Sequence, residues 1–363
     1  MSLLFMDTKE AAAADLPRQK TTLLIQNWYD AALFFLHQGD FLRKHDMRSV
    51  QVIAILLGLF KNVGDFGLQP TLMAAGIRIA QCLGMDKEPP TVSTDPIDQE
   101  VSRRIWWTLI ICEWLQRPAR PYCIQESDFA VNLPFNLDDE EILDPQLRAH
   151  PTGARDRPRP VQYHNAMIAL SQLYYRFSSR AKCIGHNSEK LESLVLQTDE
   201  ALANLIEELP LHLSGDSVPE SGLENNSVPP WVLWQRNSLS ISILFYRMAI
   251  NRILQNQWVQ LEKSYARTQA VCLSSARAIV SLVERYSAQL ARHRPWATSS
   301  NLFSAAITLA VEARFSDEHT AAAYSEDINR CIAFFTSIQD QNVLASRAIE
   351  VLRQYMTEPP DPW

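Results

Sequence analysis

The side chains that could bind a metal ion or act as a nucleophile are spread along the whole chain. The six cysteines are Cys82, Cys112, Cys123, Cys183, Cys272 and Cys331. No two of them form a Cys-x-x-Cys pair, and none has a histidine at metal-ligand spacing. The sequence therefore predicts no metal site and no bound cofactor. Four of the thiols fall in apolar helical stretches, and we expect buried free cysteines at Cys82, Cys112, Cys272 and Cys331.

Motifs of the common enzyme classes do not occur in the sequence. The eight histidines are scattered. Neither His45, next to Asp46, nor His164, next to Tyr163, forms a triad with a serine or cysteine that the sequence identifies. There is no phosphate-binding loop, GxSxG turn, HExxH helix or dinucleotide fingerprint. The sequence therefore predicts no catalytic residue.

Charge patterning gives little sign of nucleic-acid binding. The formal net charge is −7, whereas a domain that grips phosphates by itself usually has a basic surface. Residues 138–141 are acidic, and the segment Arg148–Arg159 is basic and rich in proline. Such a segment could touch phosphates, but it is more often simply solvated. We expect no tight DNA binding by this chain alone.

The elements that must position these side chains are helices. Ten glycines against 20 prolines disfavour a glycine-dependent β or Rossmann-like fold. Apolar residues recur with helical period in a first helix around residues 24–36 and a second that Ser49 should cap. Further helices are expected at about 70–83, 96–116, 161–184, 188–208, 231–258, 263–290, 298–315, 319–337 and 341–356. The sequence thus predicts an all-α fold, a single large domain of about ten helices.

The helix expected at about 96–116 should lie at the centre of this fold. Asp95 suits its N-cap and Pro96 its first position. Residues 105–115, IWWTLIICEWL, are apolar almost all round, which is typical of a helix buried on every side. The carboxylate of Glu113 in this stretch must be paired or protonated. Arg117 and Arg120 are the available cations, and a ligand-sensing acid is the alternative.

The expected layout is one domain with two irregular loops. We predict a disordered segment at 1–20, a helical regulatory domain at 21–357 with loops at about 117–160 and 211–230, and a tail at 358–363. The first twenty residues lack the layout of a signal peptide. The longest apolar run, Ile53–Phe60, is too short to span a bilayer. We therefore expect an intracellular protein with no membrane association.

Two stretches resemble the middle homology region of fungal zinc-cluster transcription factors. Residues 74–89, AAGIRIAQCLGMDKEP, are similar to the family's A-x-R-x-A-x-x-L-G helix. Residues 98–134 follow its E-x-x-R-R-x-W-W motif, an acidic position, an Arg-Pro turn and a D-F-x-V-x-L-P tail. The matching positions there are Glu100, Arg103, Arg104, Trp106, Trp107, Glu113, Arg120, Pro121, Asp128, Phe129, Val131, Leu133 and Pro134. With Glu208-Leu209-Pro210 and Phe245–Arg252, the resemblance covers roughly residues 22–350.

The sequence also departs from the family pattern. Met85, Asp86 and Lys87 replace a Leu-His-Arg triplet, and Ala119 replaces the turn glycine. Members of the family normally begin with a six-cysteine zinc cluster that docks on the DNA major groove, and none precedes the first helix expected here. The resemblance therefore implies a regulatory domain that lacks the N-terminal DNA-binding module.

The motif residues are expected to act structurally or in regulation. Arg104 can pair with Glu100 one helical turn earlier, and Arg103 can lie over the ring of Trp107. The same interpretation applies to the family-motif residues Arg103, Arg104, Trp106, Trp107, Glu113, Arg120, Pro121 and Asp128. A DNA contact by the two arginines is the less favoured alternative, because both stand beside tryptophans on a buried helix.

The favoured function is a transcription regulator in the nucleus, present also in the cytoplasm, for a metabolic or secondary-metabolite gene cluster. It would act through protein partners, such as a transcription factor, a co-regulator or a second copy in a homodimer, or through a hydrophobic small molecule. The alternative is an enzyme on the same scaffold that cyclises or isomerises a hydrophobic biosynthetic intermediate. Its pocket would be lined by Trp106, Trp107, Trp114 and tyrosines. A closed pocket would favour the enzyme and an exposed apolar patch the regulator.

Overall fold

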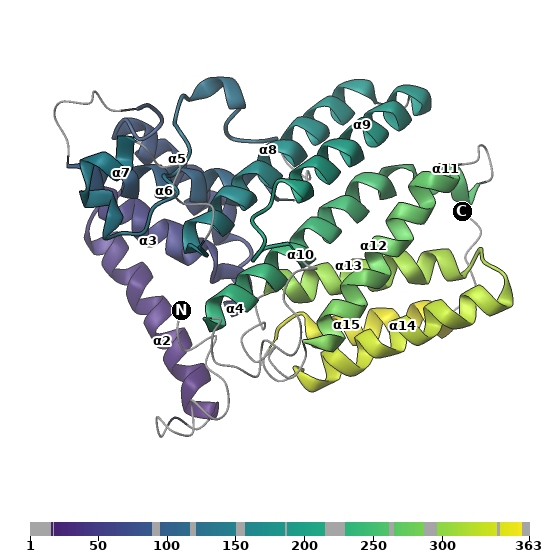
Figure 1. Cartoon of the computed structure of the whole chain (residues 1–363). Coiled ribbons are helices and arrows are strands. Elements are labelled where there is room, and N and C mark those ends of the chain that lie inside the picture. The colour runs from purple at the N-terminus through teal and green to yellow at the C-terminus, as the bar shows by residue number, and fades with distance from the viewer. Residues whose placement is uncertain are drawn as a thin grey trace. The chain divides into compact units, whose positions relative to one another are not determined.

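The computed structural model confirms the all-α prediction (Figure 1). It describes residues 16, 18–88, 95–116, 121–149, 157–185, 187–214, 229–260, 265–286, 296–339 and 342–357. Within these residues the regular structure is helical, apart from one parallel β-bridge between Lys87 and Ala130. Most of the expected end segments, residues 1–15, 17 and 358–363, lie outside this description.

The chain forms two compact units of similar length, each built from separate stretches of the sequence. Unit 1 contains residues 1–25, 179–203 and 240–363, and unit 2 contains residues 26–178 and 204–239. The boundaries fall inside four helices and not in the predicted loops. These helices are α2 (Arg18–Gln38), α8 (Pro160–Ile184), α9 (Ser188–Glu207) and α10 (Pro230–Asn251). The two units are therefore interleaved along the sequence and do not follow one another.

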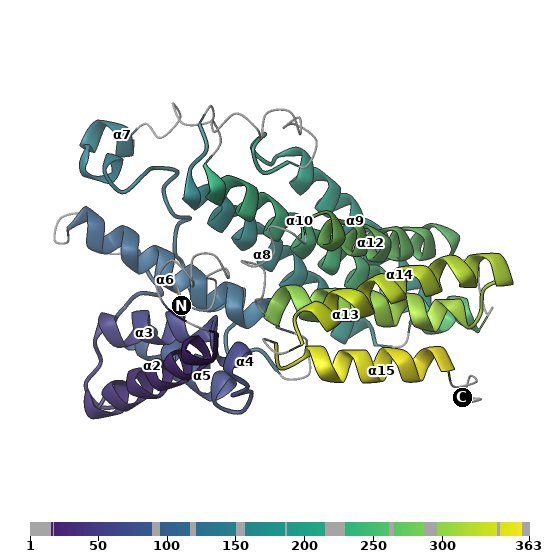
Figure 2. The same cartoon turned by 90° about the horizontal axis from the view of Figure 1, so that it is seen from below.

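Unit 2 is built on three packed helices and a long irregular connection. Helix α3 (Met47–Leu57) packs against both α5 (Leu68–Cys82) and α6 (Pro96–Trp114), as Figure 2 shows. Unit 2 also contains parts of α2, α8, α9 and α10, and its other helical elements are short: α4 (Phe60–Val63), the 3₁₀ turns η2 (Glu126–Asp128) and η3 (Glu141–Leu143), and α7 (Pro145–Ala149). The predicted loop at about 117–160 therefore contains three short helical turns.

The packing of α5 depends on a glycine. A Cβ atom built on Gly76 would lie 2.9 Å from the Ile53 side chain of α3 and 3.6 Å from that of Leu109 in α6. Because the first distance is shorter than real contacts allow, a larger residue would require the Ile53 side chain or the helices to shift. Gly84, after α5, has the left-handed conformation expected of a helix-terminating glycine, with φ 74°.

The predicted start of α3 was wrong. The helix begins at Met47 and Asp46 caps it, accepting a hydrogen bond from the backbone N–H of Arg48 at 2.7 Å. Ser49, the predicted cap, lies inside the first turn. The apolar periodicity begins at Val50 and marks the buried face of the helix, whereas the backbone hydrogen bonds that define the helix begin a turn earlier.

The predicted central helix is present and buried within its unit. Asp95 caps α6 by accepting from the Ile97 N–H at 2.8 Å, and Pro96 occupies the first turn. From Gln99 to Gln116 every residue is buried or half-buried. Trp106, Leu109, Ile110 and Trp114 are completely enclosed. The prediction from the apolar stretch IWWTLIICEWL is thus confirmed.

Unit 1 is a bundle whose centre is α13. Helix α13 (Trp296–Ala313) packs against α12 (Ala266–Arg285), α14 (Glu318–Ser337) and α15 (Ala345–Thr357), and α13, α14 and α15 lie side by side in Figure 2. The helix predicted at 231–258 is interrupted, since α10 ends at Asn251 and is followed by η6 (Arg252–Leu254) and α11 (Gln255–Val259). The apolar pattern hid this break because Leu254 and Trp258 are both buried.

No helix among the described residues is long and apolar enough to cross a membrane.

Candidate functional site

The family-like residues gather in unit 2, where an extended segment lies against α6. We call this segment, residues 129–139, the tail. The ring of Phe129 contacts the tryptophans of α6. Further along the tail, the carbonyl of Asn132 accepts a hydrogen bond from the indole of Trp107, and the backbone N–H of Phe135 donates one to the carboxylate of Glu100. The tail therefore runs antiparallel to α6, from its C-terminal half back towards its first turns.

Glu100 joins α6 to the tail. Its side chain is 0 % exposed and accepts from Arg104 Nε at 3.0 Å, from the Phe135 N–H at 3.1 and 3.3 Å, and from Arg103 Nη1 at 3.4 Å. The predicted pair between Arg104 and Glu100 is therefore present. Burial raises the pKa of Glu100, while the Phe135 N–H and the positive charge of Arg104 oppose that rise. This carboxylate is tolerated because several donors surround it.

Arg103 does not lie over Trp107, so that prediction was wrong. Its guanidinium is 4.7 Å from the centre of the Phe135 ring and binds Glu88 through two parallel contacts, Nε–Oε1 at 2.9 Å and Nη2–Oε2 at 2.5 Å. Glu88 also accepts from the Asn132 N–H at 2.7 Å. Hydrogen bonding from Arg103 lowers the pKa of Glu88. Glu88 and Phe135 belong to segments that are not helical, so the spacing along α6 did not predict these two contacts.

Arg104 holds the far end of the tail. Its Nη1 binds Asp139 at 2.7 Å, and its Nη2 lies 3.5 Å from the Leu137 carbonyl. Together with the contacts of Arg103, this gives both arginines of the motif carboxylate partners within the same unit. The two arginines therefore hold the tail against α6, and their positive charges are compensated by these carboxylates.

The three tryptophans of α6 form a packed aromatic core. Their ring centres lie 5.3, 5.5 and 5.8 Å from Phe129 for Trp106, Trp107 and Trp114 respectively. Trp114 also stacks on Tyr175 of α8 at 4.3 Å and donates to the Ile124 carbonyl at 3.2 Å. The rings therefore contact other side chains instead of lining an open pocket. This packing gives the enzymatic alternative no support.

Glu113 anchors the chain just after the Arg-Pro turn. Its carboxylate is buried and accepts from the Cys123 N–H at 2.5 Å. Burial, followed by the negative charge of Glu113, raises the pKa of the Cys123 thiol. The two cations predicted for Glu113, Arg117 and Arg120, lie outside the described residues. The described geometry thus gives Glu113 a backbone hydrogen bond as its partner.

The two remaining motif residues lie on the surface. Pro121 is exposed, immediately before the segment that Glu113 anchors. Asp128 closes the η2 turn, since its Oδ2 accepts from the Gln125 N–H at 2.8 Å. Both therefore shape the path of the chain between α6 and the tail.

The acidic and basic clusters of the long connection bind each other. Arg157 lies 2.5 Å from Asp138 and 2.8 Å from Glu141. Arg159 is 4 % exposed and donates twice to Glu141 at 3.1 Å. Arg159 holds the pKa of Glu141 down at about 2. These two arginines are thus engaged within the molecule, while residues 150–156 of the basic segment lie outside the described part of the chain.

The cysteines are only partly as expected. Cys272 and Cys331 are buried, and burial raises the pKa of each thiol to about 12. Cys112 is half-buried, and Cys82 is exposed. The prediction for Cys82 was wrong because it is the last residue of α5, where the buried face of the helix ends. Among the described residues no group of three or more His, Cys, Asp or Glu side chains could hold a metal ion.

Two buried carboxylates outside the family-like motif, Asp199 and Glu312, were not predicted from the sequence. Arg247, within the family-like stretch Phe245–Arg252, forms a bidentate pair with Asp199 of α9 at 2.6 and 3.0 Å. Glu312 of α13 accepts from the Trp258 indole at 3.1 Å and from the Gln269 amide. For Glu312 the available signal was a lone acid in the otherwise apolar helical stretch ITLAVEA, whereas Asp199 stands beside Glu200 in LVLQTDEAL and had no such signal.

Comparison with known proteins decides the family. Residues 1–207 match the model of the fungal specific transcription factor domain, which is more than half of the 363 residues. The chain belongs to that family. In this fungal specific transcription factor domain, the RR-WW motif lies on α6, and its side chains contact the tail.

Several fungal regulators are similar to this chain. The agnestins biosynthesis cluster transcription factor AgnL11 of Paecilomyces divaricatus is 21 % identical over 358 residues, which cover 92 % of this chain and 50 % of that protein. The aurofusarin cluster transcription factor aurR2 of Gibberella zeae is 27 % identical over 211 residues, 52 % of this chain and 30 % of that protein. The probable transcription factor lepB of Aspergillus flavus is 24 % identical over 283 residues, 70 % of this chain and 48 % of that protein. This chain thus spans half or less of each of these relatives.

His164 should make the domain sensitive to acid. Burial, followed by the positive charge of Arg104, lowers its pKa to about 4 from an ordinary 6.5. The stability that depends on its neutral ring is present above pH 6.5 and is lost as the pH falls towards about 4. At ~1.4 kcal/mol per pKa unit, the loss reaches about 3 kcal/mol. Urea unfolding of His164→Gln between pH 7 and pH 4.5 should show a clearly smaller loss than the parent chain. The same substitution at the exposed His319 is the control, and identical pH slopes for parent and His164→Gln would refute the assignment.

Proposed function

We propose that this chain is a nuclear transcription regulator that controls a biosynthetic gene cluster through protein partners. The proposal depends on one observation: the chain contains a fungal specific transcription factor domain in which the RR-WW residues of α6 hold the tail. The similar proteins AgnL11 and aurR2 are described as cluster transcription factors. Since this chain spans half or less of their length, we transfer only the class of function, and neither their target clusters nor their products.

The charges of the site favour a scaffold over a chemical centre. Arg103 and Arg104 are both held by carboxylates, and their geometry supports a role in fixing the tail. The tryptophan rings of α6 pack against the rings of Phe129 and Tyr175. We infer that the cluster gives the domain one defined shape, on which partner surfaces elsewhere can depend.

Helix α2 supports association with a second copy of the chain. Its side chains Trp28 and Phe34 are each 57 % exposed and Phe35 is 70 % exposed, although all three are large and apolar. Exposed aromatic groups on one helix are typical of a contact surface. We propose that this face contributes to the homodimer, and sedimentation equilibrium of the purified chain should give twice the monomer mass. A monomer at all concentrations would contradict this.

The proposed function can be tested by tethering. The chain fused to an unrelated DNA-binding domain should raise or lower transcription of a reporter that carries the matching sites. The same fusion with Glu100→Ala, which disturbs the seat of the tail, should act more weakly at equal protein level. A fusion that is folded and nuclear but leaves the reporter unchanged would contradict the proposal.

A further inference from the structure

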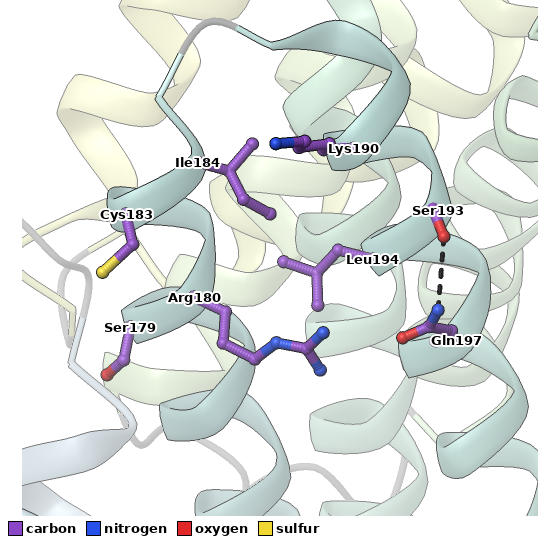
Figure 3. A pocket seen from close by; sticks show the side chains of 8 residues that line it. All are labelled: Ser179, Arg180, Cys183, Ile184, Lys190, Ser193, Leu194 and Gln197. Carbon is purple, nitrogen blue, oxygen red and sulfur yellow. Dashed lines mark hydrogen bonds between the residues drawn. The ribbon is translucent and has the colours of Figure 1, made fainter.

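The C-terminal end of α8 and the N-terminal end of α9 border an open groove in unit 1. Helix α8 stops at Ile184, and Gly185, in the left-handed conformation with φ 62°, leads the chain towards α9. The groove has a volume of about 540 Å³ and is lined by the last turns of α8 and the first turns of α9 (Figure 3). All of its lining residues belong to the same compact unit, so its geometry is defined within that unit.

The groove has two cations without partners among the described residues. Arg180 reaches from α8 towards α9 on the side of Gln197, and Lys190 of α9 lies on the side of Ile184 (Figure 3). Neither forms an ion pair within the described part of the chain, whereas Arg103, Arg159 and Arg247 all do. The neighbouring acids of α9, Glu189 and Glu192, do not line the groove. The groove therefore presents uncompensated positive charge.

Between the two cations the surface is apolar. Leu194 forms a buried floor and Ile184 a half-buried side, while Ser193 and Gln197, hydrogen-bonded to each other at 3.2 Å, form part of the exposed rim. Pockets for small molecules usually enclose most of the ligand. This groove is open, since most of its lining side chains are exposed, and an open groove along two helices suits a peptide segment that lays an apolar edge into it.

We propose that this groove binds an acidic, amphipathic peptide segment of a partner protein. Apolar side chains of the segment contact Leu194 and Ile184, and its carboxylates bind Arg180 and Lys190 on either side. This inference rests on the proposed function, in which the chain acts through protein partners, and it names one surface for them. Because the two cations are exposed, added salt weakens the interaction.

Fluorescence polarisation of the full chain tests the proposal with two labelled 15-residue peptides of identical Leu, Ala and Glu content. In one peptide the leucines fall on one helical face, and in the other they are scrambled. The chain should bind the first peptide more tightly. The double variant Arg180→Glu, Lys190→Glu should weaken that binding at least about tenfold, since two favourable ion pairs become repulsive. The matched control is Arg267→Glu, an exposed arginine of α12 in the same unit, which should bind as the parent does.

A charge exchange and a chemical footprint complete the test. The double variant should prefer a peptide in which lysines replace the glutamates. In the parent chain the amphipathic peptide should slow the alkylation of Cys183, which lines the groove, and not that of the exposed Cys82. Equal binding of the two peptides, no effect of the double variant, or no protection of Cys183 would overturn the proposal. Protection of Cys183 by dodecanoate and not by the peptide would also overturn it and assign the groove to a small anionic amphiphile. These results are independent of the reporter experiment. If the reporter experiment fails, the proposed function is overturned even if the peptide binds.

Discussion

Replacing Glu100 by alanine lowers the free energy of unfolding by about 3–5 kcal/mol, the range for removing one partner of a buried ion pair. The reason is the position of this carboxylate, which is 0 % exposed and shared by two arginines and the Phe135 N–H. Its loss leaves Arg103, itself mostly buried, with Glu88 alone and frees the backbone of the tail. Urea unfolding of the purified variant and parent at pH 7 measures the difference.

An exposed pair of the same kind provides the control. Arg347 and Glu350 lie 2.6 Å apart with side chains 68 % and 65 % exposed. Glu350→Ala should cost less than about 1 kcal/mol because water screens such a pair. If Glu100→Ala costs no more than this control, the α6–tail network is not what holds the tail.

Replacing Trp114 by alanine should cost about 3–5 kcal/mol, the usual loss for a large aromatic side chain in a core. The side chain is completely buried, stacks on Tyr175 at 4.3 Å and donates to the Ile124 carbonyl at 3.2 Å. The substitution therefore removes a ring–ring contact, leaves a cavity and orphans a carbonyl group. Urea unfolding followed by far-ultraviolet circular dichroism measures the loss.

An exposed aromatic residue outside the proposed dimer face is the matched control: Phe315, just after α13, is 48 % exposed. Phe315→Ala should change the free energy of unfolding by less than about 1 kcal/mol. Comparable losses at Trp114 and Phe315 would mean that the aromatic core of α6 contributes no more than an exposed surface ring.

Helical periodicity was sufficient to predict most of the fold. The stretch IWWTLIICEWL and its Asp95-Pro96 start define α6 locally, so neither depends on distant residues. The pair between Arg104 and Glu100 was predictable for the same reason, since both lie one turn apart on one helix. Spacing within α6 was not sufficient by itself, because Arg103, predicted to lie over Trp107 one turn later, contacts Glu88 and Phe135 instead.

The tail could not be placed from sequence. Arg103 contacts Glu88 and Phe135, and both lie in irregular segments. Glu88 is 15 residues before Arg103 in the sequence, and Phe135 belongs to the tail. Extended segments without periodicity carry no signal that relates them to a helix face. The pairing of Arg247 with Asp199 was not predictable, for a different reason: the two residues are 48 apart and lie on different helices, and helical periodicity does not show which helices pack together.

The most direct test of the account is transcription after rapid removal of the protein. The chain carries a degradation tag in its host, and transcripts and metabolites are measured at short intervals after depletion. A small set of biosynthetic genes should change together, before any metabolite does, and restoring the parent chain should reverse the change. Level transcripts while one unprocessed intermediate accumulates, which the purified chain then converts, would contradict it.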